Sequence, residues 1–151
     1  IATDTVNDLQ KEVVYKKIYK RFNGNLKGKK ISIWGVAFKA NTDDVRESPA
    51  ITLVEHLLAA GSFIRIYDPK ASKNFQNIIG DSPSISYFKN RHECIRDADA
   101  LAIMTEWDEF KNDAFKVNSA MSQKIVFDSR NIVSQKKMKK NKYELHSMGR
   151  A

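Results

Sequence analysis

Between Ile31 and Gly61 the chain reads ISIWGVAFKANTDDVRESPAITLVEHLLAAG, and this stretch gives the clearest indication of its fold. The stretch begins with apolar, β-branched and aromatic residues up to Val36, which is typical of a buried strand. It ends in a helical pattern in which Ser48 can act as N-cap, Pro49 suits the first helical position and Gly61 is a stop signal. A strand followed by a loop and a helix predicts an α/β fold.

Similar units follow along the chain. Further buried-type strands are predicted at Phe63–Tyr67, Ala100–Met104 and Ile125–Phe127, with a weaker, edge-like candidate at Ser84–Phe88. Strands that alternate with helical stretches are typical of parallel sheets, because each parallel connection must cross back over the sheet. We therefore expect a single domain built on a mostly parallel sheet.

A helix precedes the first strand. Apolar residues recur near helical spacing from Thr5 to Phe22, and the residues Asn23-Gly24-Asn25 tolerate the backbone conformation of a helix end. The chain opens on Ile1 inside this pattern, without an initiator Met. We therefore expect the chain to be part of a longer protein.

Composition excludes several classes of protein. The chain has 151 residues, of which 42% are hydrophobic and 29% charged, as in ordinary globular domains. It has no apolar run long enough for a membrane span and no signal-like N-terminus, so we expect a cytoplasmic protein without membrane contact. A lone cysteine, Cys94, excludes an internal disulfide framework and a cysteine-based zinc cluster. The three histidines lack paired spacing, so no metal site is expected.

The charge balance is basic, with a net charge of +8 and a pI near 9.5. This favours an anionic partner, which could be nucleic acid, a nucleotide or phosphate. Much of the surplus lies in the run from Lys136 to Lys142, and runs of this kind are usually solvated surface. Charge alone leaves the partner open.

The segment from Ala37 to Glu47 is longer than the 2 to 6 residues that usually join a strand to a helix. It leaves the carboxyl end of a parallel strand and leads to a helix N-terminus, a place where α/β sheets bind anionic ligands. Lys39 and Arg46 there could cradle a phosphate, or Arg46 could merely pair with Asp43 and Asp44 on the surface. The glycine fingerprint of a dinucleotide site is absent, so a pyrophosphate should not be held in that manner.

A longer pattern contains this loop. The stretch Ile33–Ala50 resembles the signature that opens the C-terminal domain of the UDP-glucose/GDP-mannose dehydrogenase family. Later segments are similar to that family in the expected order, namely Tyr67–Ala71, Ala98–Phe110 and Phe127–Asn131. The ending, Tyr143–Arg150, looks like the final strand of the family. The segment Thr105-Glu106-Trp107-x-x-Phe110 most resembles the UDP-glucose branch. Ser129 departs from the family, which usually has glycine there, and so does Ala40, which replaces a common proline or lysine.

The resemblance implies a fold. It predicts a Rossmann-like three-layer α/β domain with a mostly parallel sheet over residues 27–151, preceded over residues 1–26 by the end of a long connecting helix. It also implies a function as the nucleotide-sugar-binding domain of an enzyme that oxidises UDP-glucose to UDP-glucuronate with NAD. NAD would be bound mainly by an N-terminal domain absent from this chain, as is the nucleophilic cysteine, so no catalytic residue is expected here and the chain alone should be inactive.

The resemblance assigns four binding residues. Phe38, Lys39 and Arg130 match positions at the nucleotide-sugar site, and Arg46 matches an arginine that reaches the NAD pyrophosphate. The partners implied are UDP-glucose, the rest of the same chain and further copies of it. A GDP-mannose or UDP-N-acetylmannosamine dehydrogenase remains a rival within the family. A basic nucleic-acid-binding module is the alternative class, although no aromatic-basic RNA motif or recognition helix is present.

Some residues have two interpretations. Cys94 is expected to be a structural cysteine rather than a nucleophile, since it reads as part of a short helix before a strand. Asp68 could bind ribose hydroxyls or form a turn with the adjacent proline. For Trp107 and Phe110, core packing is favoured over a place in the cleft wall.

Overall fold

The computed structural model describes residues 2–111 and 121–148, with side chains from Glu12 onward. In this part of the chain six strands form one sheet in the order β3-β2-β1-β4-β5-β6, and every neighbouring pair is parallel. The strands are β1 (Lys30–Trp34), β2 (Phe63–Tyr67), β3 (Ile85–Tyr87), β4 (Ala100–Ile103), β5 (Ile125–Asp128) and β6 (Glu144–Ser147). The predicted parallel sheet is confirmed, and this strand order is that of Rossmann folds.

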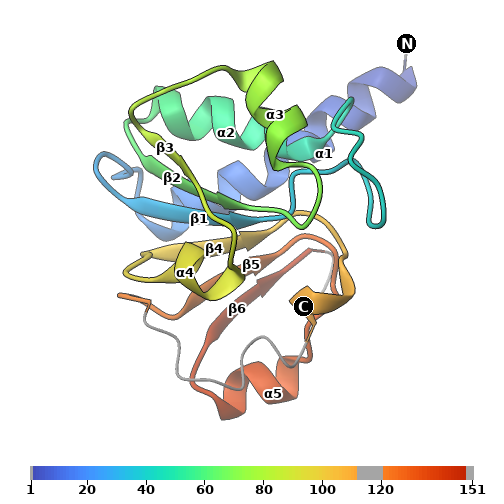
Figure 1. Cartoon of the computed structure of the whole chain (residues 1–151). Helices are drawn as coiled ribbons and strands as arrows, with labels where there is room; N and C mark the ends of the chain where they lie inside the picture. The colour runs from blue at the N-terminus through green and yellow to red at the C-terminus, as the bar shows by residue number, and fades with distance from the viewer. Residues whose placement is uncertain (1, 112–120, 149–151) are drawn as a thin grey trace.

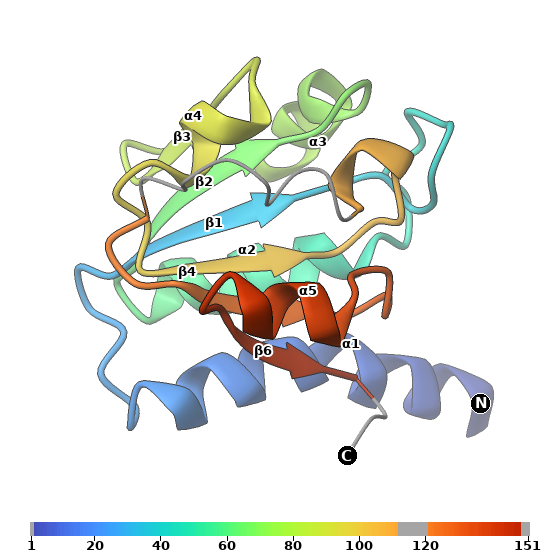
Figure 2. The same cartoon turned by 90° about the horizontal axis from the view of Figure 1, so that it is seen from below.

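Helices cover both faces of the sheet. They are α1 (Ala2–Arg21), α2 (Pro49–Ala59), α3 (Ser72–Ile79), α4 (Arg91–Ile95) and α5 (Gln135–Lys140), with a 3₁₀ turn η1 (Asp108–Phe110). Figures 1 and 2 show α1 and α2 on one face and α4 and α5 on the other. The predicted three-layer, Rossmann-like α/β fold is therefore confirmed. No helix in the described ranges is both long and apolar enough to cross a membrane.

The strand–loop–helix unit forms as its local signals predict, with one difference. β1 ends at Trp34 rather than Val36, because Gly35 has φ +93° and leaves the extended conformation. α2 begins at Pro49, and the hydroxyl oxygen of its N-cap Ser48 accepts a hydrogen bond from Ala50 N at 3.3 Å. This cap sets the start of α2 at the point where the long loop ends.

α1 is part of the same core as the sheet. Val14, Ile18 and Phe22 on its inner side are buried, and α1 packs along α2. At the far edge of the sheet, Arg21 forms an ion pair with Glu144 of β6. Glu144 is the first residue of β6, so the end of α1 lies at the amino end of the sheet, and Val13 and Val14, earlier in α1, line the cleft described below.

Candidate functional site

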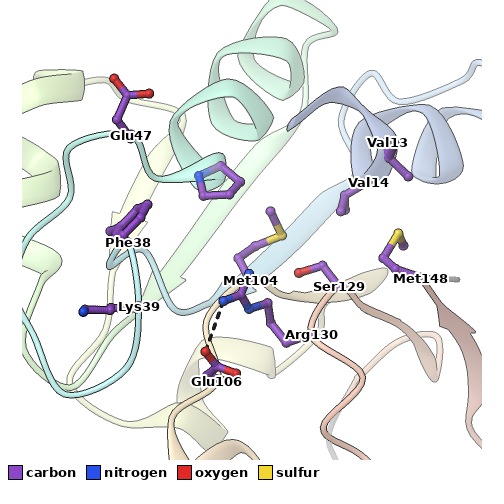
Figure 3. Close-up of a pocket in the computed structure, with 11 residues that line it drawn as sticks. Val13, Val14, Phe38, Lys39, Glu47, Met104, Glu106, Ser129, Arg130 and Met148 are labelled. Atoms are coloured by element: carbon purple, nitrogen blue, oxygen red, sulfur yellow. Dashed lines mark hydrogen bonds and ion pairs between the residues drawn. The ribbon is translucent and has the colours of Figure 1, made fainter. Parts of the chain in front are cut away.

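The order of the strands reverses between β1 and β4, which lie side by side at the centre of the sheet. Parallel α/β sheets bind ligands at the carboxyl ends of the strands beside such a switch point. A cleft of about 850 Å³ lies there. It is lined by Val13, Val14, Phe38, Lys39, Glu47, Pro49, Met104, Glu106, Ser129, Arg130 and Met148, as Figure 3 shows.

Asp68 holds the loop that leaves β1. Its side chain is buried, and its Oδ2 accepts hydrogen bonds from Val36 N at 2.8 Å and Ala37 N at 3.1 Å. Its Oδ1 accepts from Lys70 N at 2.9 Å and Ala71 N at 2.8 Å. The turn-forming interpretation of Asp68 is confirmed, because backbone donors surround its carboxylate.

The loop from Ala37 to Glu47 closes on itself. Phe38 N donates to Asp44 O at 2.7 Å, and Val45 is buried as an apolar anchor. Thr105, after β4, donates from its hydroxyl to Ala37 O at 2.9 Å and so joins this loop to the next strand end. Phe38 remains 46% exposed, although large apolar residues are usually buried. The loop thus presents Phe38 to the cleft on a fixed backbone.

Arg130 is held in the cleft by the turn after β5. The buried carboxylate of Asp128 accepts hydrogen bonds from Arg130 N at 3.1 Å and Val133 N at 2.9 Å. Ser129, where the resemblance led us to expect glycine, donates from its hydroxyl to Ile103 O at 2.7 Å. The serine therefore ties this turn to β4. The side chain of Arg130 forms an ion pair with Glu106, with 3.1 Å between Nη2 and Oε1.

Lys39 also lines the cleft, as the sequence predicts, and so shares it with Phe38 and Arg130. Its ammonium points away from Arg130 in Figure 3. Two cationic side chains, Lys39 and Arg130, thus share the cleft with two carboxylates, Glu47 and Glu106. The two cationic side chains can donate hydrogen bonds to an anionic group, and the two carboxylates can accept hydrogen bonds from hydroxyls.

Arg46 lies outside the set of cleft-lining residues. Its guanidinium forms a bidentate pair with Asp44, at 3.1 Å from Nε to Oδ1 and 3.0 Å from Nη2 to Oδ2, and its side chain is 84% exposed. Hydrogen bonding to this guanidinium lowers the pKa of Asp44 to about 2. The sequence left open that Arg46 pairs with Asp43 and Asp44 on the surface, and the structure shows this pairing for Asp44. Contact of Arg46 with NAD stays a prediction.

Cys94 is a structural residue, as predicted. It is fully buried in α4, and its thiol donates to Arg65 O at 3.3 Å. Burial raises the pKa of the Cys94 thiol to about 12, so the reactive thiolate is not formed near neutral pH. In the described ranges, no cluster of three or more His, Cys, Asp and Glu side chains is arranged to hold a metal ion.

The aromatic residues after β4 belong to the core, which confirms the favoured interpretation. Phe110 is fully buried and stacks on Trp34, with 5.2 Å between ring centroids. Trp107 is buried as well, and its Nε1 donates to Asp68 Oδ2 at 3.3 Å. Neither residue is among those that line the cleft.

Several cleft residues were not predicted as binding residues from the sequence. Met104 and Glu106 follow β4, whereas Val13 and Val14 lie on α1, almost a hundred positions earlier in the chain. In sequence terms the valines were part of an ordinary amphipathic pattern. For Glu106 the available signals were its place just beyond a buried strand, at the edge where ligands bind, and its membership of the Thr105–Phe110 segment that resembles the family.

The exposed lysines of the late run lie on and just after α5. Lys136, Lys137, Lys139 and Lys140 are exposed on this helix, and Met138 packs inward. None of these residues lines the cleft. The positive charge of this late run is therefore separate from the cleft.

Comparison with known proteins agrees with this geometry. Residues 32–135 match the UDP-binding domain of the UDP-glucose/GDP-mannose dehydrogenase family. A UDP-glucose 6-dehydrogenase of Rhizobium meliloti is 36% identical over 150 residues, which cover 99% of this chain and 34% of the relative. A UDP-glucose 6-dehydrogenase of Haloferax volcanii is 39% identical over 137 residues, covering 89% of this chain and 30% of the relative.

The fold of this chain is also similar to parts of solved dehydrogenase structures. A UDP-glucose dehydrogenase from Pyrobaculum islandicum superposes with a TM-score of 0.75 at 26% identity, over 96% of this chain and 30% of that one. A UDP-D-ManNAc dehydrogenase from Pyrococcus horikoshii gives a TM-score of 0.67 at 25% identity, over 93% of this chain and 30% of that one. The chain spans about a third of the length of these relatives. The chain belongs to the UDP-glucose/GDP-mannose dehydrogenase family, and it contains the family's C-terminal UDP-binding domain.

Proposed function

We propose that this chain is the nucleotide-sugar-binding part of an NAD-dependent dehydrogenase that oxidises UDP-glucose to UDP-glucuronate in the cytoplasm. One observation carries the proposal: Phe38, Lys39 and Arg130, which come from distant segments, line one cleft at the carboxyl ends of the parallel strands. The names of the Rhizobium and Haloferax relatives support UDP-glucose as the substrate.

In this proposal the cleft binds UDP-glucose through complementary groups. Lys39 and Arg130 provide positive charge and hydrogen-bond donors for the diphosphate and the hydroxyls, and Phe38 provides an exposed ring that can cover an apolar face of the ligand. Substrate binding, rather than bond breaking, is the task of these residues, and none of them acts as the nucleophile.

NAD would accept the hydride, and Arg46 is the residue of this chain proposed to contact it. The exposed loop position of Arg46 fits this role, because a guanidinium there can reach across to a pyrophosphate held by another domain. To do so, the guanidinium of Arg46 must leave its ion pair with Asp44 and bind the pyrophosphate instead. The sequence around Gly35 lacks the dinucleotide fingerprint, so most of the NAD site would lie outside this chain.

The division of the chain also belongs to this proposal. Residues 1–26 would be the end of a helix that connects to the catalytic part, and residues 27–151 would be the nucleotide-sugar-binding domain. The same helix would bring copies together in a homo-oligomer. A sedimentation experiment on the whole protein would test the last point.

The nearest rivals act on other nucleotide sugars, as the UDP-D-ManNAc dehydrogenase from Pyrococcus horikoshii does by name. The deciding experiment measures kcat/KM of the whole protein for UDP-glucose, GDP-mannose and UDP-N-acetylmannosamine with NAD. We expect UDP-glucose to give the highest value. A preference for another sugar would replace the substrate and leave the binding-domain assignment intact.

A second experiment uses the chain alone. We expect it to lack dehydrogenase activity and to bind UDP only weakly, since part of the substrate site would be missing. Calorimetric titration with UDP measures the affinity, and an NADH absorbance assay measures turnover. Oxidation of UDP-glucose by the chain alone would contradict the proposed division of labour.

A further inference from the structure

Glu106 lies in the cleft beside Arg130, although no sequence pattern marked it as a binding residue. Its Oε1 accepts a hydrogen bond from Arg130 Nη2 at 3.1 Å, drawn as a dashed line in Figure 3. Both side chains line the cleft and both remain partly exposed, at 47% for Glu106 and 33% for Arg130. The pair is therefore within reach of a ligand.

The backbone of Glu106 is held on both sides. Thr105 and Trp107 are buried, and each makes a hydrogen bond to another strand end: Thr105 to Ala37 O at 2.9 Å, Trp107 to Asp68 Oδ2 at 3.3 Å. Glu106 stands exposed between them. The side chain of Glu106 therefore extends into the cleft from a fixed backbone position.

The backbone of Arg130 is fixed in the same way. Its N–H donates to the buried Asp128, and Asp128 pairs with Ile103 in the register of β5 and β4. The sheet thus sets the separation between the two backbones, and the remaining freedom lies in the two side chains, of which that of Arg130 is the longer. A side chain of this length loses considerable conformational entropy when a ligand orders it.

We infer that Glu106 is a positioning residue for substrate binding, an inference that rests on the proposed function. Its carboxylate holds the guanidinium of Arg130 in the cleft before the ligand arrives. A guanidinium has five N–H donors, and Glu106 engages one nitrogen, so donors remain for the nucleotide sugar. Ordering Arg130 in advance lowers the entropic cost of binding.

The carboxylate of Glu106 also has an opposing effect, because a negative charge in the cleft repels a diphosphate. Positioning of Arg130 and repulsion of the substrate predict opposite changes in KM when the charge of Glu106 is removed. If Glu106 positions Arg130, removing its charge raises KM; if it competes with the substrate for Arg130, removing its charge lowers KM. The pair is partly exposed, so the direct repulsion is screened by water, and we expect positioning to dominate.

The test is Glu106→Gln in the whole protein. We expect KM for UDP-glucose to rise about three- to fivefold, the size expected of a partly exposed ion pair, with kcat, KM for NAD and the melting temperature unchanged. Asp108→Asn is the matched control, since it removes the same charge from the same loop at a side chain that is 95% exposed and outside the cleft. This control should leave KM at the wild-type value.

A double variant shows whether Glu106 acts through Arg130. Arg130→Ala alone should raise KM more than Glu106→Gln does, and adding Glu106→Gln to it should raise KM no further. An unchanged or lower KM in Glu106→Gln, or a full additional increase in the double variant, would overturn the inference.

Calorimetric binding of UDP separates this inference from the proposed function. If the whole protein does not oxidise UDP-glucose but Glu106→Gln weakens UDP binding, the inference holds and the proposed substrate is wrong. If UDP-glucose is oxidised with the same KM by wild type and Glu106→Gln, the proposed function holds and the inference fails.

Discussion

Gly35 leaves no room for a side chain against Thr105: a Cβ built on Gly35 would lie 2.5 Å from Thr105 Cβ and 2.8 Å from its backbone nitrogen. The two residues follow neighbouring strands, β1 and β4, and Thr105 lies between the cleft-lining residues Met104 and Glu106. Thr105 also donates to Ala37 O, so this close approach joins the two loops that carry Lys39 and Glu106. The geometry of the cleft thus depends on the absence of a methyl group.

Gly35→Ala should therefore destabilise the protein. Alanine would meet the backbone of Thr105 and would also have to adopt φ +93°, so we expect a loss of at least about 2 kcal/mol in the free energy of unfolding. Denaturant unfolding followed by circular dichroism measures it. Gly28→Ala is the control, because Gly28 has a similar φ of +76° but nothing within 4 Å of its Cβ position. Equal losses in the two variants would show that the contact with Thr105 is unimportant.

Lys39→Ala in the whole protein should mainly impair use of the nucleotide sugar. Loss of a charged hydrogen bond to the ligand should raise KM for UDP-glucose roughly tenfold to a hundredfold, with a smaller effect on KM for NAD. Steady-state kinetics with each substrate varied in turn measures both constants. Lys137→Ala, at an exposed lysine of α5 outside the cleft, is the matched control and should behave as wild type.

Arg46→Ala should have the complementary effect, since Arg46 is proposed to contact the pyrophosphate of NAD. We expect KM for NAD to rise about five- to tenfold, as for loss of a charge-assisted hydrogen bond at an exposed site, with KM for UDP-glucose little changed. Arg96→Ala, at another exposed arginine, serves as control. If Arg46→Ala left KM for NAD at its wild-type value, Arg46 would have only the surface role seen with Asp44.

The Asp44–Arg46 pair also predicts a titration. The pKa of Asp44 is lowered from 3.8 to about 2 by hydrogen bonds from Arg46, so its carboxylate stays charged in the folded state well below pH 4. A lowered pKa means that the stabilising effect of the pair is fully present above the ordinary value and is lost as the pH falls through about 2. Carboxyl NMR should show this midpoint, and Arg46→Ala should return it towards 3.8. A wild-type midpoint already near 3.8 would contradict the pairing in solution.

Cys94 should resist alkylation in the folded protein. Its thiol is 0% exposed, and the increase in its pKa from 9 to about 12 reduces the thiolate fraction about a thousandfold at a given pH. Iodoacetamide at pH 8 should modify it only slowly under native conditions and rapidly in guanidinium chloride, as mass spectrometry would show. A short cysteine peptide provides the reference rate. Native labelling as fast as that of the peptide would show that α4 opens readily.

Local signals predicted the central elements well. Ser48 and Pro49 marked the start of α2, and an apolar run marked β2 at its observed bounds. By contrast, α3 was missed, because its N-cap is Ala71, which makes no side-chain cap hydrogen bond. α5 was also missed, since its lysines gave a pattern of charge rather than of helical periodicity. Elements that depend on tertiary contacts for their stability carry weaker local signals.

The residues of the site also fall into those that the sequence predicted and those that it did not. Phe38, Lys39 and Arg130 were predicted from their resemblance to a family signature, and the structure brings all three to one cleft. Glu106 was not predicted, because its proposed role arises from a partner that lies 24 positions away, in the turn after β5. Nothing in the residues around Glu106 specifies that neighbour.

The order of residues was sufficient for the α/β class, the long loop before α2 and membership of the family, since these depend on short-range patterns and on a continuous signature. The composition of the cleft was decided by the pairing of strands. The carboxyl ends of β1, β4 and β5 are aligned, and the loops that follow them bring Lys39, Glu106 and Arg130 to one cleft. Arg46 lies outside this cleft. Hydrogen bonding between strands far apart in the chain sets these distances, and the alternation of apolar and polar residues within each strand does not encode them.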